Sequence, residues 1–348
     1  MRSWLTWSAV VVGTLAVAVN AAAAYVYFDD ASRAHTVARG VTVAGVEVGG
    51  LTEAKARARV ARALVPRLER PLVLRFGPRR FVVDPQRAGL AVEVDRMVAD
   101  AVALSRRGSL LERFARDVRG RSVDVALPLR AAYSTAAIQR FVRDVARKVD
   151  RPARSAEVVA NAVAVRVRPS REGIAVRRDA LAAELRRRLV DPRAARTLAV
   201  PTRVVRPDVS TAQLPRRYPA FITVSRGTFS LRLFRRLKLV RTYRIAVGQA
   251  GLETPAGLYK IDDKQVNPSW HVPKSPWAGE LAGRVIPPGP QDPIKARWMG
   301  FYNGAGIHGT DNIGSLGSAA SHGCIRMSIP DVEELYELVP YGTPIYIG

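Results

Sequence analysis

The sequence predicts a multidomain chain with an N-terminal transmembrane helix, α+β repeat modules and a mainly β C-terminal domain. Three observations support this fold class. The chain has 348 residues, more than one domain usually holds. It is uncharged between Arg2 and Asp29, and one Pro-Gly motif occurs twice. We expect an anchor with its connector, two modules and a C-terminal domain, with boundaries at 1–39, 40–130, 131–210 and 218–348.

The apolar stretch Leu5 to Phe28 predicts the membrane helix. Its 24 residues exceed the apolar core of about 7–15 residues in a signal peptide, and a span needs about 20. Arg2 on one side and Asp29 with Asp30 on the other place the N-terminus in the cytoplasm. We therefore expect a single-pass membrane protein whose remaining chain is extracytoplasmic. The small residues at 20–24 leave cleavage and secretion as the alternative.

The two modules rest on a repeated pattern. Residues 82–92 (VVDPQRAGLAV) and 166–176 (RVRPSREGIAV) share Pro-x-x-x-Gly-[Leu/Ile]-Ala-Val at an offset of 84 residues. A β-like run precedes each copy, and a helical run follows it. This predicts two copies of one small α+β unit, with a chance match of common residues as the alternative. Upstream, alternating valines from Val41 predict strands, and a helix should begin near Thr52.

The C-terminal domain is predicted from alternation and turns. Residues 204–219 contain three prolines and no apolar period, which indicates a linker. Residues 221–248 alternate aromatic and β-branched side chains in three short runs, which predicts an antiparallel meander. A helix should begin near Pro330, and GTPIYIG should form the last strand.

The charge balance limits the partners. There are 55 Lys and Arg against 30 Asp and Glu, a net charge of +25, and most of the excess precedes Tyr218. No groove-reading or base-stacking motif accompanies this charge, so we expect no nucleic-acid partner. An anionic membrane surface or anionic wall polymers fit better, and a merely solvated basic face is the alternative.

Cys324 is the single cysteine and cannot form a disulfide within the chain. Exported proteins usually pair their cysteines, so this thiol is either a buried small hydrophobe or is needed for chemistry. His308 precedes it by sixteen residues, and His322 and Gly323 adjoin it. A catalytic thiol needs a base and amide donors for an oxyanion, which these residues can supply. Arg326 offers a fixed positive fork suited to a substrate carboxylate.

Metal binding is a competing interpretation of the same residues. His308, His322 and Cys324 could bind zinc, with His271 as a fourth ligand. The His-x-Cys gap is tighter than usual ligand spacings, and no acidic base lies nearby in the sequence.

The stretch Ser321 to Met327 (SHGCIRM), preceded by His308-Gly309, resembles the active-site signature of the L,D-transpeptidases, bacterial enzymes that cross-link peptidoglycan stem peptides. The N-terminal part is similar to peptidoglycan-binding modules found ahead of such domains. Further matches to the catalytic domain are Gly248, Thr254, Pro255, Gly257, the stretch NPSW at 267–270 and YGTPIYI near the end.

The resemblance implies that Cys324 is the nucleophile and that His308 is the base, held by the carbonyl of Gly309. We expect the neighbouring base to lower the pKa of the thiol. The resemblance implies neither a metal nor an organic cofactor.

The resemblance also implies pocket residues. His322, Gly323 and Ser321 shape the pocket and its oxyanion hole, and Tyr302 lies near a pocket tyrosine of some members. Arg326 stands where many members have asparagine, at a substrate contact.

The implied activity is a peptidoglycan L,D-transpeptidase that forms a cysteine acyl-enzyme. It would cleave between the third stem residue and the terminal D-alanine and then cross-link to a second stem peptide. An L,D-carboxypeptidase or a variant that attaches proteins to the wall would use the same residues. A non-enzymatic wall-binding protein is the alternative from another class, with the modules as a stalk.

Overall fold

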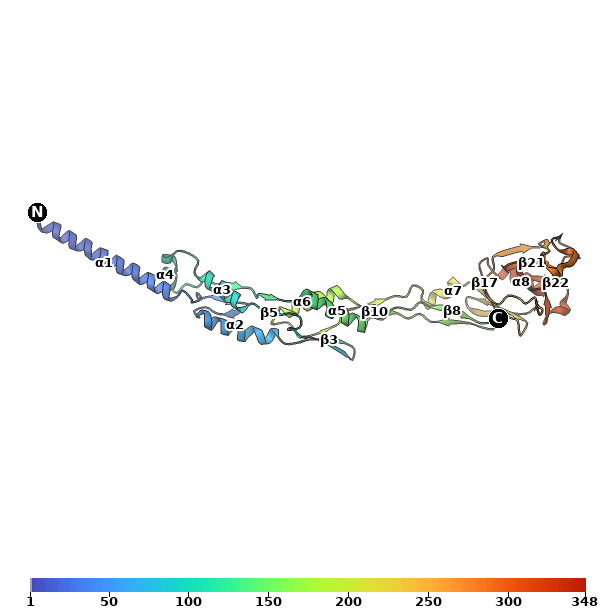
Figure 1. Ribbon diagram of the computed structural model, residues 1–348, viewed down its shortest axis with the longest axis horizontal. Helices are drawn as coiled ribbons and strands as arrows, with labels where there is room; N and C mark the ends of the chain where they lie inside the picture. The colour runs from blue at the N-terminus through green and yellow to red at the C-terminus, as the bar shows by residue number, and fades with distance from the viewer. Residues whose placement is uncertain (1) are drawn as a thin grey trace. The chain divides into compact units, whose positions relative to one another are not determined.

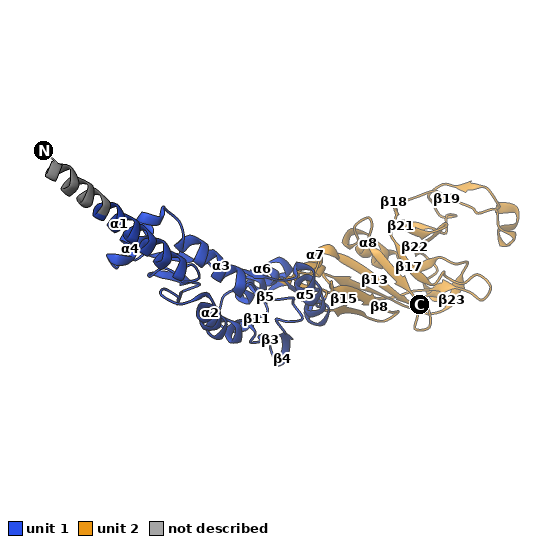
Figure 2. Ribbon diagram, turned by 60° about the vertical axis from the view of Figure 1, so that its left-hand side comes forward, with its two compact units in different colours: residues 1–151, 174–203 blue, residues 152–173, 204–348 orange. Residues whose placement is uncertain are grey.

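A computed structural model describes residues 2–348, with side chains described from residue 14 onward. The chain divides into two compact units (Figure 2). Unit 1 comprises residues 1–151 and 174–203, and unit 2 comprises residues 152–173 and 204–348. A segment from the middle of the sequence, 152–173, therefore belongs with the C-terminal part of the chain.

Unit 1 combines helices with short strands (Figure 1). Its helices are α1 (Arg2–Ser32), α2 (Glu53–Leu68), α3 (Val94–Ser105), α4 (Leu110–Val118), α5 (Thr135–Val149) and α6 (Arg178–Leu189). Its strands are β1 (Val41–Val43), β2 (Val46–Glu47), β3 (Leu72–Phe76), β4 (Arg79–Val83), β5 (Ala91–Val92), β6 (Val125–Leu127), β7 (Ala131–Ala132) and β11 (Thr197–Ala199). Strands β10 (Gly173–Val176) and β12 (Thr202–Val205) lie where the chain passes from one unit to the other.

The predicted membrane span lies within α1. Its first part, residues 5–13, falls outside the residues whose side chains are described. No helix in the described part of the chain combines the length and the apolar character needed to cross a membrane.

The repeated motif marks two runs of elements in the same order: helix, hairpin, short strand, helix. The first run is α2, β3, β4, β5 and α3, and the second is α5, β8 (Glu157–Ala160), β9 (Val165–Arg168), β10 and α6. The closing helices, 94–105 and 178–189, are offset by the same 84 residues as the motif.

The predicted boundary at 130/131 does not separate two cores. One core joins α2, α3 and β1, where Ala56, Val60, Leu64 and Leu68 form one buried stripe of α2. The other joins the first run's hairpin, β3 and β4, to α5 and α6 of the second run. Strand β3 also pairs in parallel with β11. The first hairpin thus packs on the second pair of helices, because its own helices already enclose a core with β1.

Unit 2 is mainly β (Figures 1 and 2). Its strands are β8, β9, β13 (Ala220–Ser225), β14 (Ser230–Arg235), β15 (Lys238–Arg244), β16 (Val247–Gly248), β17 (Gly257–Lys260), β18 (Asp263–Val266), β19 (Trp270–His271), β20 (Val285–Ile286), β21 (Lys295–Tyr302), β22 (Ala305–Thr310), β23 (Ala319–Ser321), β24 (Ile325–Ser328) and β25 (Pro344–Ile347). Its helical segments are η1 (Thr211–Gln213), α7 (Leu214–Arg217), η2 (Pro276–Leu281), η3 (Ile313–Ser315) and α8 (Ile329–Leu338).

Two sheets and α8 share the core of unit 2. One sheet has the order β15-β14-β13-β25-β17, and the other has the order β18-β21-β22-β24. The predicted meander is confirmed as β13, β14 and β15, which pair antiparallel. The predicted last strand, β25, pairs in parallel with β13 inside the first sheet. The predicted helix is α8, whose N-cap residue Ser328 accepts a hydrogen bond from the backbone N–H of Asp331.

The segment predicted as a linker, 204–219, is partly ordered structure. Ser210 and Gln213 form a reciprocal capping box at η1, and Leu214 in α7 is buried. The hairpin β8–β9 lies against the same region, because Ser170 and Thr211 exchange hydrogen bonds. The segment has no apolar period, and the capping pair with one buried leucine is enough to order part of it.

Candidate active site

The candidate site lies on strands β22 and β24, which run in parallel. Their register pairs Ile307 with Ile325 and His308 with Arg326. The isoleucines belong to the core of unit 2. Since successive side chains of a strand point to opposite faces, His308 and Arg326 lie together on the face away from that core.

Cys324 directly precedes β24. A hydrogen bond from the Gly306 backbone reaches its thiol, which agrees with extending the register of the two strands by one residue. Two residues before Arg326, Cys324 is on the same face as His308. The thiol is half-buried and free. The fold therefore brings the predicted nucleophile, the predicted base and Arg326 to one face of neighbouring strands.

His308 is buried, and its tautomer is set by its neighbour. Its Nδ1 lies 2.8 Å from the carbonyl oxygen of Gly309. A carbonyl only accepts, so Nδ1 carries the proton and Nε2 is left as the basic nitrogen. Burial lowers the pKa of His308 to about 4, and the charge of Arg326 lowers it further. The hydrogen bond that His308 donates to the Gly309 carbonyl opposes both. The imidazole is therefore neutral at physiological pH.

The pKa of the Cys324 thiol differs from the sequence-based expectation. Burial raises the pKa of the thiol above its ordinary value, although the Gly306 hydrogen bond and the charge of Arg326 both oppose this. The expected lowering of the pKa is therefore wrong for the resting protein, because desolvation outweighs the neighbouring groups. The site rests as a thiol and a neutral imidazole.

The loop before the thiol is fixed by Ser321, which is buried. Its hydroxyl donates to the Cys324 carbonyl and accepts from the Gly323 N–H at 3.2 Å. Gly323 has φ +110°, a conformation that other residues rarely adopt. An added Cβ there would meet the Leu252 carbonyl oxygen at 3.7 Å, so the 248–254 segment adjoins this loop. These contacts fix the turn of the backbone that leads from Ser321 to Cys324.

The site also contains two tryptophans, Trp298 and Trp277, which the sequence analysis did not predict. Trp298 is the register partner of His308, and the two rings stack at 6.2 Å. Its Nε1 donates to Asp263 at 2.9 Å, which fixes the indole over the strand. Trp277 of η2 stacks on His322 at 4.2 Å with 8° between the ring planes. Neither tryptophan is near the motif in sequence, so only the sheet register and the path of the long loop reveal them.

The other predicted residues differ in their surroundings. Tyr302 is exposed at the end of β21, and its ring lies 4.8 Å from that of Tyr259. The side chain of Arg326 forms no ion pair with a described carboxylate. His271 is exposed on β19. Within the described residues, no three His, Cys, Asp or Glu side chains gather closely enough to hold a metal.

A thiol and an oriented imidazole on one face of neighbouring strands fit a thiol-dependent acyl-transfer site. Comparison with known proteins identifies the family. Residues 219–347 match the YkuD family, the L,D-transpeptidase catalytic domain. Residues 81–196 match the family described as "Putative peptidoglycan binding domain".

Relatives of known name match the C-terminal part of the chain. The chain is 38% identical over 134 residues to "Putative L,D-transpeptidase YkuD" of Bacillus licheniformis, covering 38% of this chain and 68% of that protein. It is 36% identical over 135 residues to the protein of the same name in Bacillus subtilis, covering 38% and 69%. The chain therefore belongs to the L,D-transpeptidase family, with a peptidoglycan-binding domain ahead of the catalytic domain.

Solved structures give a weaker match. The chain aligns with an L,D-transpeptidase from Mycobacterium tuberculosis at 17% identity and a TM-score of 0.31, over 37% of this chain and 57% of that one. The catalytic domain of the Enterococcus faecium L,D-transpeptidase aligns at 23% identity and a TM-score of 0.31, over 37% and 96%. The assignment to the family rests on the sequence matches.

Proposed function

We propose that the chain is a peptidoglycan L,D-transpeptidase that works through a cysteine acyl-enzyme. The observation that carries the proposal is the placement of His308, whose Nδ1 is held by Gly309 and whose strand lies beside the residue following Cys324. This tautomer directs a basic Nε2 to the face that the thiol shares. Ser321 and Gly323 supply the turn that aims the loop amides at the same face.

The first half-reaction transfers an acyl group to the thiol. Sγ of Cys324 attacks the carbonyl carbon of the third stem residue while its proton passes to Nε2 of His308. The oxyanion rests on the backbone N–H groups of His322 and Cys324, because the Gly323 N–H donates to the Ser321 hydroxyl. The bond to the terminal D-alanine then breaks, and the leaving amine takes the proton from the imidazolium. A thioester and free D-alanine result.

The second half-reaction returns the thiol. The side-chain amine of a second stem attacks the thioester carbonyl and loses a proton to His308, and the Cys324 sulfur leaves and regains its proton. The product is an amide cross-link. If water replaces the amine, the same residues give an L,D-carboxypeptidase, and a protein amine would give attachment to the wall.

Arg326 is the proposed contact for a substrate carboxylate. The residue is half-buried, and its charge acts on the pKa of both Cys324 and His308. Among the described residues no acidic side chain pairs with it, so its donors are available to a ligand. Trp277 on His322 supplies an apolar wall beside the loop. Tyr302 has no such support in the resting structure, and its substrate contact stays a prediction.

We place the activity outside the cytoplasm, where peptidoglycan is found. The order of charge, Arg2 before the apolar stretch and Asp29 after it, supports this orientation. Attachment through residues 5–28, or secretion after cleavage there, is part of the same proposal. Protease added to intact cells should remove the catalytic unit; a protected unit that becomes sensitive only after lysis would contradict the location.

Intact-protein mass spectrometry of the full chain with a tetrapeptide stem tests the activity. A thioester adduct that lacks the terminal D-alanine, formed by the native chain and absent from Cys324→Ala, is the expected result. Adding a second stem should then yield the cross-linked product, whereas release of a tripeptide alone would favour the carboxypeptidase. A folded protein with a titratable thiol that forms no adduct and releases no D-alanine would overturn the enzyme proposal and favour wall binding.

A further inference from the structure

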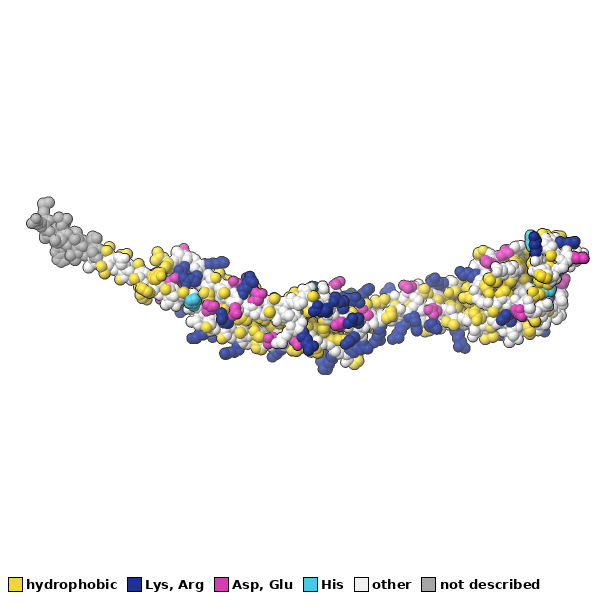
Figure 3. Space-filling view, viewed as in Figure 1, with side chains coloured by type: hydrophobic (Ala, Val, Ile, Leu, Met, Phe, Trp, Pro, Cys, Tyr) yellow, Lys and Arg dark blue, Asp and Glu magenta, His cyan; other side chains and the backbone are white. Residues whose placement is uncertain are grey.

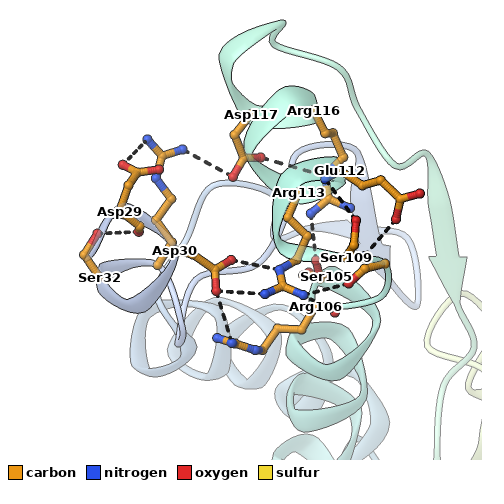
Figure 4. A network of polar contacts seen from close by, with 12 residues as sticks. Asp29, Asp30, Ser32, Ser105, Arg106, Ser109, Glu112, Arg113, Arg116 and Asp117 are labelled. Atoms are coloured by element: carbon orange, nitrogen blue, oxygen red, sulfur yellow. Dashed lines mark hydrogen bonds and ion pairs between the residues drawn. The ribbon is translucent and has the colours of Figure 1, made fainter. Parts of the chain in front are cut away.

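Helix α4 in unit 1 is docked through its charged face. Arg113 donates from Nε to Oδ1 and from Nη2 to Oδ2 of Asp30, both at 2.8 Å (Figure 4). Arg116 donates to the Ser105 carbonyl at 2.7 Å, and Ser109 with Glu112 forms a capping box at the start of the helix. The polar side chains of α4 thus hold it against the end of α1 and the end of α3.

Two apolar side chains of α4, Leu111 and Val118, consequently face outward, and Phe114 is half-buried. None of its residues is buried, and Leu111 and Val118 are 71% and 70% exposed. Leu111, Phe114 and Val118 follow the i, i+3, i+7 spacing of one helical stripe. A helix of a soluble domain normally turns such a stripe to the core and its charges to water. In α4 the arrangement is reversed.

The stripe continues onto the end of α1. Phe114 meets Tyr25 edge to face, with ring centroids 6.2 Å apart. Tyr25 and Phe28 are themselves 66% and 69% exposed. Figure 3 shows hydrophobic side chains along the visible described part of α1, followed by Lys and Arg side chains further along unit 1. Two helices therefore expose neighbouring apolar surface.

Arginines surround this apolar surface. Arg106 and Arg107 precede α4, and Arg119 and Arg121 follow it. Arg106 has one long contact with Asp30 at 3.4 Å. The side chains of Arg107, Arg119 and Arg121 are exposed and form no ion pair with a described carboxylate. A cavity of about 260 Å³ opens between α1 and α4, with Arg39, Arg106 and Arg121 among its lining residues.

We infer that α4 lies in the surface of an anionic phospholipid bilayer. Its stripe, Leu111, Phe114 and Val118, enters the boundary between headgroups and acyl chains, as in helices that lie in a membrane interface. Tyr25 sits at the headgroup level that aromatic residues favour. The flanking arginines bind lipid phosphates. This contact adjoins the end of the apolar stretch 5–28 through Tyr25 and is independent of the proposed catalytic function.

Other occupants fit the surface less well. A wall polymer could satisfy the arginines but would leave the apolar stripe in contact with water. A second copy of the chain could cover the stripe but would bring two sets of unpaired arginines together, which is unfavourable. A bilayer of anionic lipids satisfies the stripe and the arginines at once.

Single-site fluorescence on the full chain tests the inference. In a Cys324→Ala background, the environment-sensitive fluorophore NBD is attached through Leu111→Cys or Val118→Cys. Val82→Cys on β4, an exposed apolar position at 57%, is the matched control. On vesicles of phosphatidylglycerol and phosphatidylcholine, the probes at 111 and 118 should brighten severalfold and be quenched by brominated lipids, while the probe at 82 should not change.

Three outcomes would overturn the inference. The probes at 111 and 118 could match the control on vesicles that carry the protein. They could respond only to protein concentration without lipid, which would indicate self-association, or only to insoluble peptidoglycan.

The arginines are tested separately. Arg119→Gln with Arg121→Gln should weaken binding to anionic vesicles by about fivefold per residue, and should leave binding to neutral vesicles unchanged. Unchanged dependence on lipid charge would contradict their assignment.

Discussion

Burial shifts the pKa of two side chains in the candidate site, Cys324 and His308. It raises the pKa of the Cys324 thiol and lowers that of His308 to about 4, so both groups rest in their neutral forms. A preformed thiolate–imidazolium pair is therefore absent in the resting state. In the proposed mechanism, proton transfer to His308 therefore accompanies attack on the substrate. A resting thiol is also oxidised less readily than a thiolate.

The neutral pair predicts how alkylation depends on pH. The rate of Cys324 with iodoacetamide should rise continuously from pH 5 through pH 9, because the thiolate fraction grows up to a pKa above 9.0. Mass spectrometry of the alkylated chain measures this directly. A plateau beginning below pH 7 would show an ion pair and contradict the assignment.

His308 also predicts an acid-sensitive stability. Its folded-state pKa of about 4 lies below its ordinary value of 6.5. Between these values the unfolded chain binds a proton that the folded chain does not, so stability falls as pH drops through this window. The free energy of unfolding, measured in urea, should fall between pH 7 and pH 4 for both proteins. For His308→Gln we expect this fall to be smaller than for the native chain by about 1–3 kcal/mol.

The control for this experiment is the exposed His271 of the same unit. His271→Gln should keep the acid dependence of the native protein. Equal slopes for the native chain and His308→Gln would mean that the buried imidazole contributes nothing to it.

The packing of strand β22 against its neighbouring elements explains why a glycine, Gly309, follows the proposed base His308. A Cβ on Gly309 would lie 2.6 Å from the Lys295 carbonyl oxygen on β21 and 3.0 Å from Val332 of α8. Only a residue without a side chain lets β21 and α8 approach this closely. The carbonyl of Gly309 also orients His308, so packing and the orientation of the proposed base depend on one position.

Gly309→Ala should therefore affect both. We expect a loss of about 1–3 kcal/mol in unfolding free energy from overpacking, and a larger relative loss in kcat than in KM, because the His308 ring loses its fixed orientation. Gly227→Ala is the matched control, since a Cβ there meets nothing within 4 Å. A fully active Gly309→Ala would show that the carbonyl does not set the position of His308.

Local signals made several elements predictable from the sequence. Alternation predicted β13, β14 and β15, and Pro330 with its acidic neighbours predicted α8. The motif around Cys324 also predicted the residues that β22 and β24 bring together. The stacked Trp298 and Trp277 were not predictable, because sheet register and a long loop place them. The raised pKa of Cys324 depends on burial, which the motif does not encode.

One core of unit 1 joins the hairpin of the first sequence repeat to the helices of the second. The repeated motif revealed the duplication, since the periodic elements of each copy are local. It could not reveal which helices each hairpin would cover, because that choice depends on the cores already formed. Strand β3 of the first copy packs against α5 and α6 of the second. The hairpin β8–β9 of the second copy in turn belongs to unit 2.

This shared core predicts that damage to the first copy will unfold the helices of the second. Leu72 on β3 is fully buried in the core that contains Val142 of α5 and Leu185 of α6. Leu72→Ala should cost about 2–5 kcal/mol, and hydrogen exchange should lose its protection in α5 and α6. The control is Val82→Ala on the neighbouring strand, whose side chain is exposed and should cost little. If α5 and α6 keep native protection in Leu72→Ala while only residues before 131 exchange faster, the copies are independent modules. Loss of protection in α5 and α6 as well would instead show that the first hairpin and these two helices unfold as one core.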